Sequence, residues 1–293
     1  MAALLQSTPA TLSHREAPAS HAVIEQPPRT LHLGRALVDA ALEAGHAVVA
    51  TVRGESALPE HDRMTVLNLD VRDRSAARAT VLRAADMLGR IDVLVNNAGY
   101  GLIGAIEEAT EDDARAIVDT NLLGPLWLSQ AVIPVMRRQG VGHIVQISSV
   151  GAVGTMPMLG LYNSTKWGLE AFSEAMAGEV GRFGIRVSLI EPGALDTDWA
   201  GASMRFSAPL DAYEAQRIET FGTAEVPWPS GGEPAGGTAP RDAAMAILER
   251  ASATDDRRLR VLIGDDAPEQ VRQALDLRQQ DYARDLRYAG AAG

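Results

Sequence analysis

The stretch from residue 143 to residue 166, HIVQISSVGAVGTMPMLGLYNSTK, decides how this chain folds. It begins with the run HIVQI at residues 143–147, which we interpret as a β-strand, like the continuous apolar run HAVVATV at residues 46–52, which is typical of a strand buried on both faces of a parallel sheet. Two serines end the run, and thirteen residues after Ser149 comes Tyr162, followed four positions later by Lys166. Residues four apart on a helix share one face, so a helix beginning near Tyr162 would carry the phenol and the amine side by side.

Short apolar runs and longer helical patterns alternate on both sides of this stretch. Strands are expected at residues 46–52, 64–69, 91–95, 143–147, 185–190 and 259–263, and helices at 35–44, 74–88, 110–138, 162–183, 243–250 and 267–288. Such units predict a single α/β domain over residues 21–293, with a doubly wound parallel sheet and helices on both faces. Ligands of such sheets bind beyond the carboxyl ends of the strands, which is where the two serines lie.

The composition restricts the function further. A net charge of −11 argues against a nucleic-acid partner and gives no electrostatic reason to bind an anionic membrane, and no apolar run is long enough for a transmembrane helix. The chain has no cysteine, and its six histidines are scattered, so no metal site is expected. Residues 1–20 lack the pattern of a signal peptide and are expected to form a disordered leader before a cytoplasmic domain.

The polar residues at the predicted strand ends resemble those of the short-chain dehydrogenase/reductase family, whose fold is of the Rossmann type. The resemblance runs from about residue 33 to residue 199. It rests on residues that occur in the family's order and spacing, namely Asn96-Asn97-Ala98-Gly99, Asn121, Ser149, Tyr162-x-x-x-Lys166 and Pro192-Gly193-x-x-x-Thr197.

The resemblance implies an active site built on Tyr162, Lys166, Ser149 and Asn121. The lysine ammonium would lower the pKa of the tyrosine from about 10 toward neutrality, so that Tyr162 could exchange a proton with a substrate oxygen. Ser149 would hold the same oxygen, and Asn121 would close a water-linked proton path to the lysine. Hydride would pass to or from a nicotinamide beside this group.

The glycine-rich turn that binds the cofactor pyrophosphate in this family is degenerate here. The family pattern is Thr-Gly-x-x-x-Gly-x-Gly, and alignment on the helix start puts Pro28 and His32 at the first two glycines and leaves only Gly34. Proline removes a backbone donor, and an imidazole adds bulk where the cofactor touches backbone. Either this loop takes another path, or the dinucleotide binds weakly or not at all.

Other cofactor positions of the family persist. Arg53 follows the second strand, where a basic residue can pair with a ribose 2′-phosphate, so NADP(H) is expected rather than NAD(H). Asp70 follows the third strand, where the family contacts adenine. The remaining positions that the resemblance assigns to the cofactor are Asn97, Ala98, Gly99, Pro192, Gly193 and Thr197.

Residues 194–240 are rich in glycine and proline and poor in regular pattern, and are expected to form a mobile lid over the substrate. The candidate substrate contacts indicate an apolar small molecule, and they are Met156, Met158, Trp199, Met204 and Phe206. The alternative is that these side chains only pack in the core.

Three functions remain open at this point. The first is an NADP(H)-dependent ketone reductase or secondary-alcohol dehydrogenase. The second is an enzyme on the same scaffold that has lost the dinucleotide and uses Ser149, Tyr162 and Lys166 for non-redox acid–base chemistry, such as elimination, isomerisation, cyclisation or epoxide chemistry. The third is a non-catalytic binding subunit. Members of the family are commonly dimers or tetramers, so the resemblance implies a homodimer or homotetramer.

Overall fold

The computed structural model describes residues 21–22, 33–55, 58–196, 204–227, 236–253 and 255–290, and it has the predicted α/β architecture. The expected leader at 1–20 lies outside the described residues. The same holds for Pro28 and His32 in the degenerate turn, and for Thr197 and Trp199.

The strands form one parallel layer in two hydrogen-bonded groups. The first group has the order β1-β2-β3, with β1 (His21–Ala22), β2 (Ala47–Val52) and β3 (Met64–Asn68). The second has the order β4-β6-β7-β9, with β4 (Val93–Asn96), β6 (Gly142–Ile147), β7 (Ile185–Pro192) and β9 (Arg260–Ile263). Because β1 lies beside β4, the strand order reverses between them, which is where ligands bind in open sheets of this kind.

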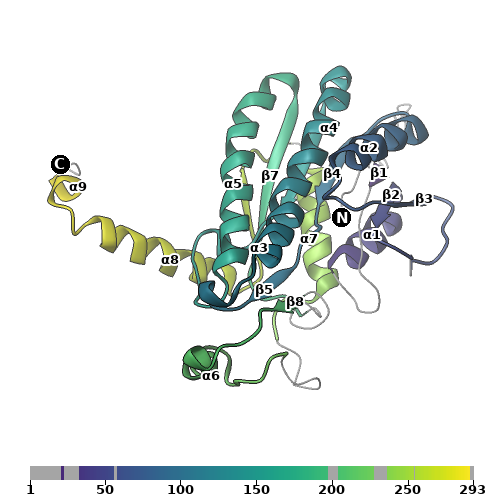
Figure 1. Cartoon of the computed structure of the whole chain (residues 1–293). Coiled ribbons are helices and arrows are strands. Elements are labelled where there is room, and N and C mark those ends of the chain that lie inside the picture. Colours follow the sequence, from purple (N-terminus) through teal and green to yellow (C-terminus); the bar gives the residue numbers. More distant parts are fainter. Residues whose placement is uncertain are drawn as a thin grey trace.

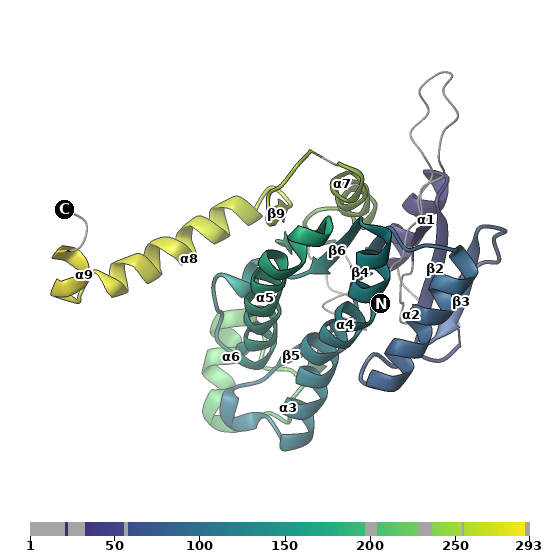
Figure 2. The same ribbon diagram turned by 90° about the horizontal axis from the view of Figure 1, so that it is seen from above.

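Helices cover both faces of this layer (Figures 1 and 2). On one face α1 (Leu33–Glu43) packs against α7 (Pro240–Ser252), and on the other α2 (Arg74–Leu88), α4 (Gly124–Gln139) and α5 (Gly160–Val180) lie side by side. The core between them consists of the apolar strand runs that the sequence predicts, and β6 is buried along its whole length. Gly89 ends α2 at a φ of 75°, a left-handed conformation that glycine adopts without strain.

The helix predicted from residue 110 to residue 138 is not one regular helix. The predicted cap is present, because Thr110 Oγ1 accepts from the backbone nitrogen of Asp113 at 3.1 Å at the start of α3 (Glu111–Val118). A π-helical segment (Asp119–Leu123) then separates α3 from α4, and its last hydrogen bond runs from Gly124 back to Asp119. One extra residue per turn is not visible in an apolar repeat, and segments of this kind are frequent at functional sites.

The expected lid contains more regular structure than its composition indicates. The strand β5 (Gly101–Ile103) pairs in parallel with β8 (Met204–Phe206), and α6 (Glu214–Phe221) follows, set off from the sheet (Figure 1). Arg217 of α6 forms a buried ion pair of 2.5 Å with Glu108, which lies in a 3₁₀ turn (Ile106–Glu108) after β5. Residues 204–221 of the expected lid thus contain a strand and a helix, which contacts distant in sequence hold in place.

The single helix predicted for residues 267–288 is also wrong. It is divided into α8 (Ala267–Tyr282) and α9 (Leu286–Gly290), because the backbone turns at residues 283–285. The first part of α8 packs against the edge strand β9, and Arg278 further along the helix contacts Val153 and Trp167. The far end of the helix projects away from the body (Figures 1 and 2). Among the described residues, the structure contains no helix of the length and apolarity that a membrane crossing requires.

Candidate active site

The four residues predicted for the active site converge at the carboxyl end of the sheet. Tyr162 and Lys166 lie one turn apart near the start of α5, and these residues are only 7% and 5% exposed. The lysine Nζ is 5.8 Å from the centroid of the tyrosine ring. Ser149 follows β6, and its side chain hydrogen bonds with the phenol of Tyr162. The spacing of the motif therefore places the phenol, the hydroxyl and the amine in one small volume.

Asn121 joins this group through the π-helical segment that carries it. Its Nδ2 donates to the carbonyl oxygen of Tyr100 (2.9 Å) and to Thr165 Oγ1 (3.3 Å), while its Oδ1 accepts from the backbone nitrogen of Tyr100 (3.1 Å). Thr165 in turn donates to the carbonyl oxygen of Tyr162 at 2.7 Å. Both the oxygen and the nitrogen of the Asn121 amide are thus held by hydrogen bonds, and one of its partners, Thr165, directly precedes Lys166 on α5.

Gly99 completes the floor of the site. A Cβ atom at this position would lie 3.3 Å from Asn121 Oδ1 and 3.6 Å from Lys166 Nζ. The absence of a side chain keeps the space beside the amine open. This open cradle is compatible with the family's use of the same segment to contact a cofactor.

Burial sets the pKa values of the tyrosine and the lysine. It raises the pKa of Tyr162 to about 12, and the hydrogen bond with Ser149 acts in the opposite direction. It also lowers the pKa of Lys166 to about 8, and the negative charge of Glu170 opposes that change. The prediction that the lysine brings the tyrosine pKa toward neutrality is therefore wrong for this state. The ammonium is directed at the carbonyl oxygen of Ile147, at 2.8 Å, instead of at the phenol.

Lys166 is the only lysine in the 293-residue chain, although the chain has 27 lysine and arginine residues together. Lysine is usually an exposed residue with a flexible, hydrated side chain. Here the single lysine is buried beside the tyrosine. Every other lysine or arginine position of the chain is arginine, and only this buried position has an amine.

Several described residues fit a dinucleotide at its two ends. Arg53 is exposed directly after β2, and Asn97, Ala98 and Gly99 follow β4 at the point where the strand order reverses. Gly34 is buried in the first turn of α1, Pro192 ends β7 beside β6, and Gly193 follows it. The segment that would bind the pyrophosphate falls in residues 23–32, outside the described part of the chain.

Asp70 does not stand free for an adenine contact. Its carboxylate is engaged by Arg72, whose Nε and terminal nitrogen donate at 2.9 and 2.5 Å, and this pairing lowers the pKa of Asp70. The expected role of Asp70 therefore needs this pair to open. The pairing also holds the exposed guanidinium of Arg72 at the strand ends near Arg53. The sequence alone did not single out Arg72.

An apolar cluster surrounds the phenol on the substrate side. Met158 and Met204 are buried in one cluster with Tyr162, and Phe206 packs against it. The backbone of Met158 adopts a φ of 68°, which is uncommon for a residue other than glycine. Met156 is 41% exposed and outside this cluster, so the structure does not place it with the other candidate substrate contacts.

Sequence reasoning missed the polar groups behind the lysine. Glu170 lies one turn after Lys166 on α5, Glu191 is the residue before Pro192 in β7, and Arg260 begins β9. A charged residue at a position that the strand or helix pattern predicts to be buried is the sequence feature that could have indicated them. Glu191 is such a case, because it directly follows the strand predicted at residues 185–190.

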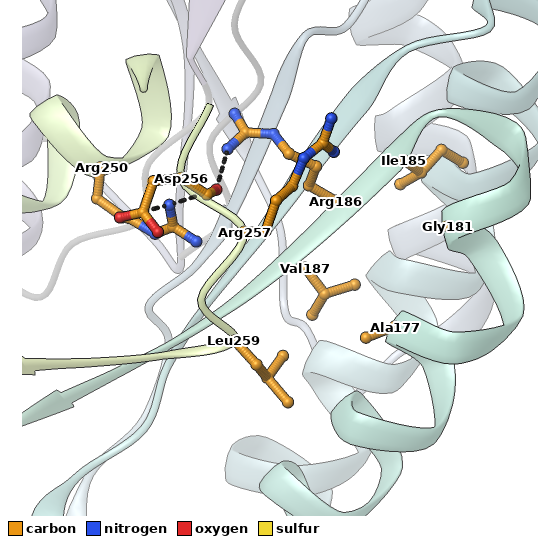
Figure 3. A pocket seen from close by; sticks show the side chains of 9 residues that line it. All are labelled: Ala177, Gly181, Ile185, Arg186, Val187, Arg250, Asp256, Arg257 and Leu259. Atoms are coloured by element: carbon orange, nitrogen blue, oxygen red, sulfur yellow. Dashed lines mark hydrogen bonds and ion pairs between the residues drawn. The ribbon is translucent and has the colours of Figure 1, made fainter. Parts of the chain in front are cut away.

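A cavity of about 170 Å³ lies elsewhere, at the amino end of β7 (Figure 3). Arg186, Arg250 and Asp256 are among the residues that line it, and the ion pairs and hydrogen bonds between them close its rim. It is at the opposite end of the strand from Glu191, so it is not part of the candidate active site. Within the described ranges, no cluster of carboxylates and histidines has the makeup of a metal site.

Known proteins with similar sequences and structures agree with this arrangement. The short chain dehydrogenase family matches residues 32–206 of the chain. Oxidoreductase BOA17 of Botryotinia fuckeliana is 37% identical over 251 residues, which is 84% of this chain and 89% of that protein. The 3-ketodihydrosphingosine reductase of Bacteroides thetaiotaomicron is 41% identical over 155 residues, 53% of this chain and 57% of the reductase.

A crystal structure of a short-chain dehydrogenase from Streptomyces avermitilis has a TM-score of 0.79 and 32% identity, covering 92% of this chain and 98% of that one. Other solved proteins with the same fold hold NAD or NADP.

Proposed function

This chain belongs to the short-chain dehydrogenase family, and from that premise we propose that it is an NADP(H)-dependent oxidoreductase that interconverts a ketone and a secondary alcohol on an apolar small molecule. The single observation that carries the proposal is the convergence of Tyr162, Lys166, Ser149 and Asn121 in a buried site at the carboxyl end of the sheet. Packing alone does not require this set of polar groups, since burying them costs free energy.

The protonation states favour the reductive direction at neutral pH. With a pKa of about 12, Tyr162 is a phenol that can donate its proton to a developing alkoxide. Ser149 is positioned to donate a hydrogen bond to the same oxygen. With a pKa of about 8, Lys166 is an ammonium at neutral pH and stabilises negative charge on the phenol oxygen as the proton leaves. A bound nicotinamide would supply the hydride to the carbonyl carbon.

The described residues support NADP(H) over NAD(H). Arg53 is an exposed guanidinium at the end of β2, and Arg72 brings a second one to the end of β3. Guanidinium groups bind phosphate in a bidentate manner, and a ribose 2′-phosphate is the group that distinguishes the two cofactors. We propose that these two arginines, with Asn97, Ala98, Gly99, Pro192, Gly193 and Thr197, hold the cofactor.

The surroundings of Tyr162 support an apolar substrate. The cluster of Met158, Met204 and Phe206 offers methyl, thioether and ring surface to a hydrocarbon group next to the phenol. The relative that reduces 3-ketodihydrosphingosine, by its name, acts on a ketone, which supports the same reaction class here. We propose that residues 194–240 close over this substrate as a lid of the single domain at 21–293, and that the protein acts as a homodimer or homotetramer in the cytoplasm.

Calorimetric titration with NADPH and NADH tests the cofactor. We expect NADPH to bind the wild-type protein more tightly than NADH, and Arg53→Ala to weaken NADPH binding by about tenfold while leaving NADH unchanged. Arg78→Ala removes an exposed arginine in the middle of α2 and serves as the matched control, with no change expected.

Absence of NADPH binding by the wild-type protein would overturn the proposal. Turnover of a substrate without any nicotinamide, lost in Tyr162→Phe, would instead support the non-redox acid–base enzyme.

A further inference from the structure

A buried acidic group lies behind Lys166 and has no part in the proposed reaction. Glu191 is 1% exposed and Glu170 is 7% exposed, and both carboxylates approach the guanidinium of Arg260, at 3.4 and 3.0 Å. Glu174, one turn further along α5, also pairs with Arg260, at 2.7 Å, but it lies largely in solvent. Carboxylates are rarely buried unless a specific interaction holds them, so this cluster calls for a role.

Glu170 is linked directly to the segment that carries the active-site hydroxyl. Its Oε1 accepts a hydrogen bond of 2.7 Å from Ser148 Oγ. Ser148 lies between Ile147, whose carbonyl oxygen accepts from Lys166 Nζ, and Ser149, whose side chain bonds to the phenol. Residues 147, 148 and 149, where β6 ends, thus contact Lys166, Glu170 and Tyr162, respectively.

The charges in the cluster do not balance. Around Arg260 stand three carboxyl groups, Glu170 and Glu174 from α5 and Glu191 from β7, and the next positive charge on α5 is Lys166. Burial, the neighbouring charge of Glu170 and a hydrogen bond with its carboxyl group together raise the pKa of Glu191 to about 7. The next carboxylate along the chain, Asp266, is engaged by the backbone nitrogen of Ala194 at 2.8 Å. Glu170, one helical turn after Lys166 on α5, is the carboxylate of this cluster whose charge acts on the amine.

We propose that Glu170 is a positioning residue whose carboxylate keeps Lys166 in its ammonium form at neutral pH, while its bond to Ser148 holds residues 147–149 against α5. Burial alone would favour the neutral amine, which cannot stabilise negative charge on Tyr162. The nearby carboxylate restores the charged form, and Arg260 limits how much of the carboxylate's field reaches the amine. The kinetic consequence of this inference rests on the proposed function, whereas the charge state of Lys166 does not.

The single lysine of the chain allows a direct measurement of that charge state. Protein grown with ¹³C at the lysine ε-carbon gives one lysine signal, and its chemical shift against pH reports the titration of Lys166. We expect the wild-type midpoint near the pKa of about 8 that burial produces. Glu170→Gln keeps an acceptor for Ser148, removes the negative charge and replaces the oxygen that accepts from Arg260 Nε, so it should lower the midpoint by about one pH unit.

Glu174→Gln is the matched control. It removes a carboxylate from the same helix and from the same arginine, but at an exposed position that solvent screens, so the lysine midpoint should stay unchanged. An unchanged midpoint in Glu170→Gln, or an equal shift in both variants, would overturn the proposal.

Arg260→Gln is a second variant, in case Glu170→Gln does not fold, and it should shift the lysine midpoint in the opposite direction. Arg260 is 43% exposed at its side chain, and removing its positive charge leaves the field of Glu170 unopposed. The lysine midpoint should therefore rise, and a fall or no change contradicts the inference. If the protein reduces a ketone, the alkaline limb of log(kcat/KM) against pH should move with the midpoint in each variant. If it shows no turnover, the proposed function fails, but the lysine titration still decides this inference.

Discussion

The two ends of strand β7 both bury charged side chains, but they hold them in different ways. At the amino end, where α7 ends, Arg186 donates to the carbonyl oxygens of Ala253 and Ala251, at 2.6 and 3.2 Å. It also donates to the carbonyl oxygen of Asp256, at 3.4 Å (Figure 3). His143 beside it has a pKa of about 3, because burial and the charge of Arg186 both disfavour its cation. At the carboxyl end, Glu191 and Lys166 titrate near pH 7 and pH 8.

The difference follows from the partners. Arginines stay charged, the pKa of His143 lies far below neutrality and Asp256 is paired with Arg250, so the groups at the amino end keep one protonation state near neutral pH and fasten α7 and the loop after it to the sheet. At the carboxyl end, titratable groups face one another in a buried site, and each shifts the pKa of its neighbour. Proton transfer at physiological pH is therefore expected only at the carboxyl end.

The largest expected effect is on catalysis at the carboxyl end. Tyr162→Phe removes the proton donor, so the kcat of NADPH-dependent ketone reduction should fall by about 10²–10⁴-fold while NADPH binding is retained. Tyr213→Phe is the control, since that hydroxyl donates to Glu107 at 2.7 Å at the edge of the same apolar cluster, and its kcat should be close to wild type. Equal kcat values for the two variants would contradict the assignment of Tyr162.

The next effect concerns stability at the amino end. His143 Nδ1 faces the carbonyl oxygen of Ala251, which can only accept, so the neutral ring carries its proton there and Nε2 accepts from Ser188. The folded pKa lies below the unfolded one, so stability is lost as pH falls from 6.5 toward 3, by up to about 5 kcal/mol in total and about 3 kcal/mol by pH 4.5.

Urea unfolding at pH 7.5 and 4.5 measures this effect. The stability difference between wild type and His143→Gln should shrink at the lower pH, because the variant has no buried imidazole to keep neutral. Exposed His61, whose ring accepts from the backbone nitrogen of Arg63, provides the control variant His61→Gln. A difference that is the same at both pH values would contradict this account of His143.

A somewhat smaller effect of opposite sign is expected at the carboxyl end. The pKa of Glu191 is higher in the folded than in the unfolded protein. Its contribution to the free energy of unfolding is therefore fully present below about pH 4.5, where the carboxyl is protonated, and is lost as pH rises through 7. Glu191→Gln should therefore be more stable than wild type at pH 8, by up to about 3 kcal/mol, and not at pH 4.5. Thermal unfolding at the two pH values measures the change, and lower stability of the variant at pH 8 would show that the ionised carboxylate is held favourably by Arg260.

The smallest effect is expected from Arg257 at the rim of the amino-end cavity. Its positive charge lowers the pKa of Arg186, so its removal relieves repulsion. Arg257→Gln should change the free energy of unfolding by less than about 0.5 kcal/mol and leave ketone reduction unchanged. A clear loss of kcat in this variant would break the distinction between the two ends of β7.

Much of the fold could be predicted because its strands and helices have simple periodicity. The strand predicted at residues 143–147 and the helix predicted after it agree with β6 and α5 to within a few residues. The strand β5 and its partner β8 could not be predicted, since three-residue strands far apart in sequence have no local signature. The same is true of the π-helical segment that carries Asn121, because its cause lies in the amide bonds to Tyr100.

By itself, the sequence determined which residues carry the chemistry. The order and spacing of Asn121, Ser149, Tyr162 and Lys166 place them at strand ends and on one helix face, because helix and strand periodicities are local properties of the chain. Only the tertiary structure decided how those residues are charged. Burial from all sides raises the pKa of Tyr162 and lowers that of Lys166, and Glu170, Glu191 and Arg260 come together from α5, β7 and β9. Desolvation and long-range charge depend on the whole surroundings of a group, so no local pattern contains them.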